Sequence, residues 1–273
     1  MPEFQLTDDD CFAELIIWAD KNDISDSLLP RNKDQLIELT ELSLIGCQLT
    51  EIPTAIAYLT KLTELNLNKN QLTELPESIG NLKQLRRLYL TGNQIKELPE
   101  EIGFLEQLTE LLLGRNKLKE LPESIAGLNK LSILSLWKNE FIEIPKSISN
   151  LTELTELHLG WNQITEIPEF IVNFTQLTEL SLGCNKLKEV PEVIGKLSGL
   201  TDLSLWQNQL TELPESIGDL SQLNYLMLSD NKLDKLPLSI SKLTQLETLS
   251  LTDNLIKALP PALSNMQAFT EFE

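Results

Sequence analysis

Leucine and isoleucine recur along the chain in an order that repeats every 23 residues. One repeat reads Leu62-x-x-Leu65-x-Leu67-x-x-Asn70-x-Leu72-x-x-Leu75-Pro76-x-x-Ile79-x-x-Leu82. Ten such repeats run from about residue 39 to residue 266, and a proline keeps the same step from Pro53 to Pro260. A period of roughly 20–50 residues is typical of a repeat array, in which each repeat packs only on its neighbours.

The spacing inside a repeat predicts its secondary structure. Leu65 and Leu67 alternate with polar neighbours, which indicates a short strand with one buried side. Pro76 cannot donate to a β-ladder and has a fixed φ, so the chain should begin its return path there. Ile79 and Leu82 are three residues apart, which suits a 3-10 turn. We therefore predict an α/β solenoid, a horseshoe with a parallel concave β-sheet and short helical or 3-10 convex segments.

An asparagine follows the predicted strand in nine repeats, and Cys47 takes the equivalent position in the first one. The side-chain amide of asparagine both donates and accepts hydrogen bonds. Backbone groups buried between successive repeats need such partners, because an unpaired buried polar group is costly. We expect these amides to join neighbouring repeats.

The segment Leu-Pro-x-x-Ile-Gly-x-Leu occurs at residues 75–82 and 213–220. A 23-residue repeat of this form is similar to the intracellular Ras-group and Ras-scaffold leucine-rich-repeat proteins and their bacterial relatives. The resemblance covers about residues 39–266. For function it implies a protein-interaction scaffold only, because one fold hosts many functions. It also implies an alternative, a regulator or scaffold of a small GTPase-type signalling protein.

Residues 1–38 break the repeat. Within them one helical stripe is formed by Phe12, Leu15, Ile16 and Ala19, with Trp18 beside it. We predict an N-terminal helical cap over the first repeat, since a terminal repeat would otherwise expose its leucines. A membrane-surface helix is the alternative, and the acidic polar residues of this segment count against it.

Residues 267–273 are predicted to be a short C-terminal cap or a truncated eleventh repeat. Phe269 and Phe272 fall where the first two strand leucines of that repeat belong. If the last repeat is partly bare, weak self-association through it is the alternative, because an open strand edge is a template for pairing.

The chain carries 41 acidic against 22 basic side chains, a formal net charge of −19. This charge argues against nucleic-acid and membrane partners, which need a basic surface. The sequence contains no apolar run of about 18 residues, so it predicts no transmembrane helix. Cys11, Cys47 and Cys184 are odd in number and lack metal-ligand spacing, and the N-terminus is acidic where a signal peptide would be basic. We predict a cytoplasmic protein; secretion without a cleaved signal is the alternative.

Three of the four tryptophans fall at the concave ends of predicted strands, namely Trp137, Trp161 and Trp206. A sheet face that meets only water seldom carries tryptophan. Gly160 and Gly183 separate Trp137 from Trp206, which are three strand steps or about 14 Å apart. This pattern predicts an aromatic-walled slot with a glycine floor. The alternative is that each tryptophan folds over the neighbouring glycine and fills a gap.

Beside the slot the outward strand positions carry His158 and the acids Glu156, Glu179 and Asp202, and Tyr225 follows one repeat later. A basic or aromatic side chain of a partner protein can enter such a slot, where the carboxylates meet its charge. We therefore predict that this aromatic and acidic patch binds a protein partner.

A second cluster on the same predicted face contains Arg86, Arg87, Tyr89 and Arg115. It can bind an acidic loop of a partner, so Arg87, Tyr89 and Arg115 join the predicted partner-binding residues. Alternatively, Glu64 and Glu110 neutralise it from the neighbouring strand positions.

His158 is the only histidine, and Ser135 and Ser181 flank it one strand away on either side. With Glu156 or Glu179 to orient it, a Ser-His-Glu hydrolase is conceivable. A sheet face, however, lacks a water-excluding pocket and an oxyanion hole. We predict a non-enzymatic protein with no cofactor, and no metal site either, because no His or Cys pair has ligand spacing.

Overall fold

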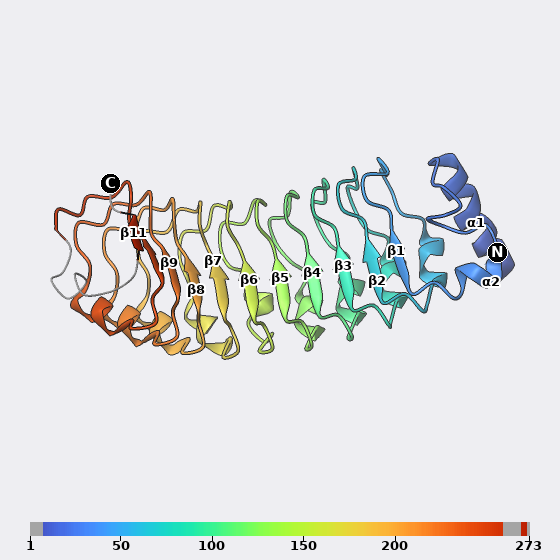
Figure 1. The fold of residues 1–273 in the computed structure, drawn as a ribbon. Coiled ribbons are helices and arrows are strands. Elements are labelled where there is room, and N and C mark those ends of the chain that lie inside the picture. The colour runs from blue at the N-terminus through green and yellow to red at the C-terminus, as the bar shows by residue number, and fades with distance from the viewer. Residues whose placement is uncertain (1–7, 259–268, 272–273) are drawn as a thin grey trace. The chain divides into compact units, whose positions relative to one another are not determined.

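A computed structural model describes residues 8–258 and 269–271 (Figure 1). The chain forms two compact units, residues 1–131 and residues 132–273. We call them the N-terminal unit and the C-terminal unit. The elements of the N-terminal unit are α1 (Asp8–Lys21), α2 (Lys33–Leu36), the strands β1 (Glu41–Ser43), β2 (Glu64–Asn66), β3 (Arg87–Tyr89) and β4 (Glu110–Leu112), and the 3-10 helices η1 (Thr54–Tyr58), η2 (Glu77–Asn81), η3 (Glu100–Phe104) and η4 (Glu123–Gly127).

The C-terminal unit continues the same alternation of strand and turn. Its strands are β5 (Ile133–Ser135), β6 (Glu156–His158), β7 (Glu179–Ser181), β8 (Asp202–Ser204), β9 (Tyr225–Met227), β10 (Thr248–Ser250) and β11 (Phe269–Glu271). Its 3-10 helices are η5 (Lys146–Ile148), η6 (Glu169–Asn173), η7 (Glu192–Lys196), η8 (Glu215–Asp219) and η9 (Leu238–Lys242).

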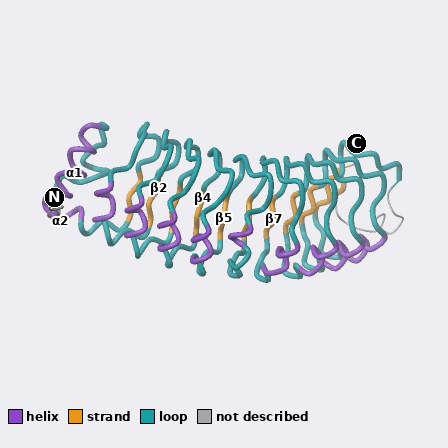
Figure 2. The backbone as a smooth tube through the Cα atoms, turned by 180° about the vertical axis from the view of Figure 1, so that it is seen from behind, coloured by secondary structure: helices purple, strands orange, loops and turns teal. Residues whose placement is uncertain are grey.

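Within each unit the strands pair in parallel and in chain order. Leu65 pairs with Leu88 in the N-terminal unit, and Leu134 pairs with Leu157 in the C-terminal unit, so the register step is one full repeat. The middle residue of each strand from β1 to β10 is buried, and its two neighbours turn outward, except that Ser135 of β5 is buried. In the repeats that begin with β1 to β9 the 3-10 helix lies away from the strand (Figure 2). The predicted solenoid with a parallel sheet and short convex turns is confirmed.

The prolines start the 3-10 helices as predicted. Pro76 has φ −68° and ψ 145°, and the helix η2 follows it directly. In some repeats a glycine follows the buried isoleucine of the 3-10 helix, and close packing between neighbouring turns requires it. A Cβ atom on Gly80 would lie 2.5 Å from the carbonyl oxygen of Glu101, and one on Gly195 would lie 2.5 Å from that of Ser216. These turns stack so closely that only glycine fits there.

The asparagine amides join each repeat to the preceding one. Asn185 donates from Nδ2 to the carbonyl oxygens of Leu159 (3.0 Å) and Leu182 (2.9 Å). Its Oδ1 accepts from the backbone N–H of Ile164 at 2.9 Å. The same three contacts recur at Asn70, Asn93, Asn116, Asn162, Asn208, Asn231 and Asn254. These eight amides therefore satisfy the buried backbone groups beside them, as expected.

The backbone turns into the left-handed region directly before each asparagine. We call these positions the left-handed column; its members are Lys69, Gly92, Arg115, Lys138, Trp161, Cys184, Gln207, Asp230 and Asp253. The non-glycine members have φ between 52° and 58°. Such a conformation is uncommon for residues other than glycine, asparagine and aspartate.

The helix α1 packs over the first repeat, and its buried face differs in part from the predicted one. Phe12, Leu15 and Ala19 are buried as expected, but Trp18 is buried as well, whereas Ile16 is partly exposed. The rings of Phe12 and Tyr58 meet edge to face at 6.0 Å between centroids, so the helix covers η1. The apolar stripe is thus rotated toward Trp18, because the contact with η1 decides which side of the helix is covered.

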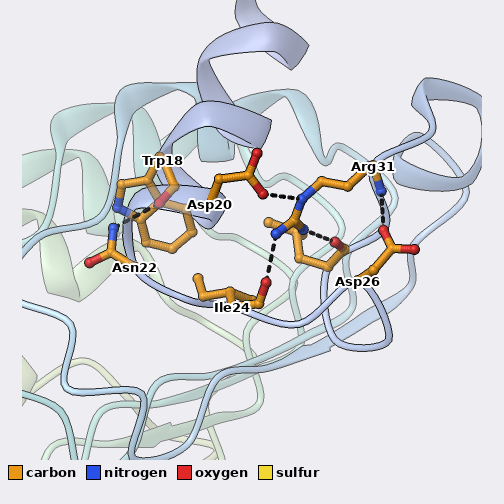
Figure 3. Close-up of polar contacts among 7 residues, drawn as sticks. Trp18, Asp20, Asn22, Ile24, Asp26 and Arg31 are labelled. Carbon is orange, nitrogen blue, oxygen red and sulfur yellow. Dashed lines mark hydrogen bonds and ion pairs between the residues drawn. The ribbon is translucent and has the colours of Figure 1, made fainter.

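The loop after α1 is closed by one arginine (Figure 3). Arg31 donates from its guanidinium to the Asp20 carboxylate at 2.8 Å and to the carbonyl oxygens of Ile24 (2.6 Å) and Leu29. The backbone N–H of Arg31 donates to Asp26 at 2.8 Å. These contacts return the chain from the helix to the first repeat.

The last strand does not continue the repeat. β11 pairs with β10 in parallel, and Phe269 stands opposite Thr248, 21 residues away rather than 23. The sequence predicts that Phe269 is the equivalent of Leu246 in the next repeat. This prediction is wrong by two residues, because the last connection is shorter than a full repeat. Phe272 lies outside the described residues, and the domain boundaries at 38, 266 and 267 stay predictions.

Among the described residues there is no helix that combines the length and the apolar character needed to span a membrane.

Replacing Asn185 by alanine tests the amide ladder. The change leaves two buried carbonyl groups and one buried N–H without their partner, so we expect the free energy of unfolding to fall by about 1–3 kcal/mol in urea denaturation. Asn254 makes the same contacts but is only part-buried, so Asn254→Ala should cost less. An equal loss in both variants would contradict the role of burial.

Candidate partner-binding site

The solvent-facing positions of β6 to β9 bring the predicted acidic residues together. Glu156 on β6 stands opposite Glu179 on β7, and Glu179 stands opposite Asp202 on β8. His158 stands opposite Ser181, two residues along the same strands. These positions belong to the C-terminal unit, as do all of the predicted aromatic residues except Tyr89.

His158 lies between two carboxylates. Its Nε2 is 3.3 Å from Oε2 of Glu156, and its Nδ1 is 3.4 Å from Oε1 of Glu179. Because both ring nitrogens face glutamates, neither is turned to the hydroxyl of Ser135 or Ser181. A serine nucleophile needs a histidine base within hydrogen-bond reach. The Ser-His-Glu arrangement considered as the enzymatic alternative is therefore not formed.

The predicted open slot is closed at one of its two glycines. A Cβ atom on Gly183 would lie 2.5 Å from Cδ1 of Trp206, so the indole of Trp206 covers this glycine. The rings of Trp161 and Trp206 meet edge to face, with centroids 5.7 Å apart and an interplanar angle of 75°. The gap-filling alternative is thus correct for Trp206. Trp137 is half-buried, and the glycine beside it, Gly160, is buried.

Trp161 is more exposed than Tyr225, the other exposed aromatic residue described on the solvent face of the C-terminal unit. Its side chain is 51% exposed, and its backbone has φ 58° as a member of the left-handed column. Gly92 takes the equivalent position in another repeat with φ 76°. The left-handed conformation costs an L-residue about 1–2 kcal/mol. A large apolar ring is thus held in water on an unfavourable backbone, a combination that marks functional positions.

A cation already lies near the Trp161 ring. Nζ of Lys138, from the preceding repeat, is 5.9 Å from the ring centroid. This distance falls within the range in which an ammonium group is attracted to an indole face. The sequence predicts that Trp161 lies at the strand end, but it does not predict that Trp161 contacts Trp206 and Lys138.

A hollow of about 310 Å³ lies on the solvent face of β7, β8 and β9. Its walls include the carboxylates of Glu179 and Asp202 and the side chains of Tyr225 and Met227. Sequence reasoning missed Met227, although it stands in the same outward column as His158. The hollow combines two acids with two apolar walls, which suits a cationic side chain with an aliphatic stem.

Tyr225 is held at the edge of this hollow. Its hydroxyl donates to Oε2 of Glu247 at 3.0 Å, and this hydrogen bond raises the pKa of Tyr225. Asp202 accepts a hydrogen bond from Thr201 at 2.7 Å. Both side chains are therefore oriented before any partner binds. Burial raises the pKa of the nearby Cys184 to about 11, so its thiol is no nucleophile at neutral pH.

The second predicted cluster lies in the N-terminal unit, and the charge of one of its arginines is paired there. Arg87 forms an ion pair with Glu64 at 2.6 Å, and this hydrogen bond raises the pKa of Arg87. Tyr89 donates to Glu110 at 2.8 Å. Arg115 is exposed and belongs to the left-handed column. The charge of Arg87 is thus met within the protein, as the alternative interpretation proposed.

The sequence matches two family profiles, and both are profiles of leucine-rich repeats. A profile described as a leucine-rich repeat region matches residues 77–180, 170–250 and 192–273, and one described as a leucine rich repeat matches residues 37–95. Comparison with the sequences of curated proteins found no significant match.

Several solved structures share the fold. The plant peptide hormone receptor RGFR1, solved in complex with RGF2, has a TM-score of 0.76 and 29% identity over 89% of this chain. The ectodomain of the receptor kinase GASSHO1/SCHENGEN3 from Arabidopsis thaliana, solved with CASPARIAN STRIP INTEGRITY FACTOR 2, has a TM-score of 0.75 and 31% identity over 88%. InlJ from Listeria monocytogenes has a TM-score of 0.74 and 30% identity over 85%. The chain spans only 41%, 32% and 48% of these three structures.

Two substitutions at Trp161 separate backbone strain from side-chain contacts. Glycine is the residue best suited to positive φ, and a β-branched residue is among the worst. We expect Trp161→Gly to leave the free energy of unfolding almost unchanged and Trp161→Val to lower it by about 1–2 kcal/mol relative to Trp161→Gly. Chemical denaturation of both variants checks this. A valine variant as stable as the glycine variant would show that the position is not strained.

Tyr89 should ionise at a higher pH than an unperturbed tyrosine. Burial, followed by the hydrogen bond to Glu110, raises its pKa from 10.0 to about 12. Because the folded-state pKa exceeds the unfolded one, the associated stability is complete below pH 10 and is lost as the pH rises toward 12. We expect the Tyr89→Phe variant to lose a tyrosinate absorbance step near pH 12. In Glu110→Gln it should move to lower pH but stay above 10, since burial is the larger cause.

Proposed function

Because the chain belongs to the leucine-rich-repeat family, we propose that it is a non-enzymatic scaffold whose protein partner binds the solvent face of the C-terminal unit. Proteins of this family commonly mediate protein–protein interactions. The observation that carries the proposal is Trp161, an aromatic side chain that is 51% exposed on a left-handed backbone. Exposed aromatic anchors of this kind dominate the binding energy of interfaces.

The site favours an extended segment with a basic and an aromatic residue. The hollow between Glu179 and Asp202 offers two carboxylates to a lysine or arginine of the partner, and the stem of that residue can pack on Met227. Trp161 and its edge-to-face neighbour Trp206 offer a surface for an aromatic or cationic group. The net charge of −19 attracts a basic partner over a longer range.

Two of the compared structures indicate what kind of partner to expect. RGFR1 and GASSHO1/SCHENGEN3 were solved in complex with RGF2 and CASPARIAN STRIP INTEGRITY FACTOR 2. Their likeness to this chain supports a peptide or an exposed protein segment as the partner. Nucleic acid, membrane lipid and organic cofactors have no part in the proposal. The cytoplasmic location and weak self-association through the last repeat stay predictions.

A regulator of a small GTPase is the second candidate. It is supported by the Leu-Pro-x-x-Ile-Gly-x-Leu segments at residues 75–82 and 213–220, which resemble those of Ras-scaffold proteins. Binding that depends on whether the partner carries GDP or GTP would favour this candidate over a constitutive scaffold.

A random peptide library displayed on phage and selected on the full chain tests the proposed function. We expect enrichment of peptides that combine basic and aromatic residues. A synthetic peptide of the enriched sequence should lose about 30-fold in affinity to Trp161→Gly, the loss typical of an interface hot spot. When the same library is selected on the double variant Glu179→Gln/Asp202→Asn, the basic residue should no longer be enriched, whereas the aromatic residue should be.

Lys69→Gly is the matched control. It relieves the same left-handed backbone in the N-terminal unit without removing an aromatic ring, so affinity should stay unchanged. Enriched acidic peptides, or peptides that bind Trp161→Gly as well as the unmodified chain, would refute the proposed site.

A further inference from the structure

Three side chains on β6 and β7 have the geometry of a cation site. Glu156, His158 and Glu179 each offer one ligand atom, and these atoms all lie within 4.8 Å of one another. Glu156 and His158 are two residues apart on one strand, and Glu179 stands opposite Glu156 on the next. All three positions are therefore held by the hydrogen-bonded sheet and not by a loop.

A neutral His158 ring cannot donate a hydrogen bond to both of the glutamates that it faces. A neutral histidine donates from one nitrogen only and carries a lone pair on the other. Here both nitrogens face carboxylate oxygens, at 3.3 and 3.4 Å. In the neutral ring one of these contacts sets a lone pair against an anion, while the two carboxylates repel each other. A divalent cation between the three groups would accept the lone pair and bind both carboxylates.

We propose that Glu156, His158 and Glu179 bind a first-row divalent cation of the zinc class, with water in the remaining coordination positions. Zinc–nitrogen and zinc–oxygen bonds of about 2.1 Å at a tetrahedral angle place two ligand atoms roughly 3.4 Å apart. The contact from each ring nitrogen to its glutamate already has this length, and a metal ion on one nitrogen would use one of the two contacts. The side chain of Glu179 is 42% exposed, so its carboxylate can rotate to the nitrogen that takes the metal.

The ligand set decides which cations the site prefers. One imidazole and two carboxylates suit zinc, nickel and copper, whereas magnesium and calcium select oxygen ligands alone. Zinc should therefore bind more tightly than magnesium. This differs from the expectation of no metal site, which considered pairs of histidine or cysteine and not one histidine between two glutamates. The site shares Glu179 with the proposed partner-binding hollow, but zinc binding needs no protein partner and is tested without one.

Zinc titration followed by imidazole NMR tests the site directly. His158 is the only histidine of the chain, so every imidazole ¹⁵N signal of a tag-free, ¹⁵N-labelled sample belongs to it. We expect saturable shifts of these signals with zinc chloride, with the ligating nitrogen moving most, and none with equimolar magnesium chloride. Glu156→Gln and Glu179→Gln should each weaken zinc binding at least tenfold, about the loss seen when even a supporting residue of a metal site is removed.

Glu41→Gln provides the matched control. Glu41 holds the same strand position as Glu156 in the first repeat, without a histidine two residues later, so its removal changes the net charge equally but should leave zinc affinity unchanged. Unshifted His158 signals in excess zinc would overturn the proposal. Equal weakening by all three variants, or equal response to magnesium, would also overturn it, because either result indicates only attraction of cations to an acidic protein.

Discussion

The buried asparagine amide is the contact on which the rest of this structure depends. The carbonyl groups at the end of each strand are enclosed by the next repeat and cannot reach water, so they need a donor within the protein. Asn185 reaches one carbonyl of its own repeat and one of the preceding repeat, and accepts an N–H in return. The hydrophobic side chains would fill the interior at several repeat spacings, but three directional hydrogen bonds from one amide are satisfied at one spacing only.

The same amide connects the fold to the candidate site. To direct the asparagine into the interior, the residue before it must turn outward on a left-handed backbone, and this requirement creates the left-handed column. Its side chains are not needed for packing and are open to other roles. Lys69, Cys184 and Gln207 are small or polar, as a strained exposed position would suggest, whereas Trp161 is large and apolar. The departure at Trp161 therefore calls for a functional reason more than any residue inside the repeat does.

The sequence predicts almost the whole fold, because a 23-residue period places strand, asparagine and turn at the same point of every repeat. It also predicts which side chains share the solvent face. It does not predict their conformations there. Trp206 covers Gly183 and touches Trp161, and His158 turns both nitrogens to glutamates; such arrangements depend on neighbours across two repeats and on open rotamer choices. The predictions for the two ends of the chain are partly wrong for a similar reason, since the buried face of α1 and the register of β11 are set by contacts outside the periodic pattern.

Departures from the repeat also fall on the turn side of the C-terminal unit. The residue after the buried isoleucine is glycine in four repeats, whereas Ser149 and Val172 take this position in the repeats that carry Trp137 and Trp161. A Cβ atom cannot be placed as near the next turn as the backbone of Gly195 lies, so the turn after Val172 must stand farther away. Strand spacing, by contrast, is set by the sheet hydrogen bonds. Wider turns on constant strands incline neighbouring repeats toward the solvent face. An inclination of this kind would bring Trp161 nearer to Trp206 and the carboxylates nearer to His158.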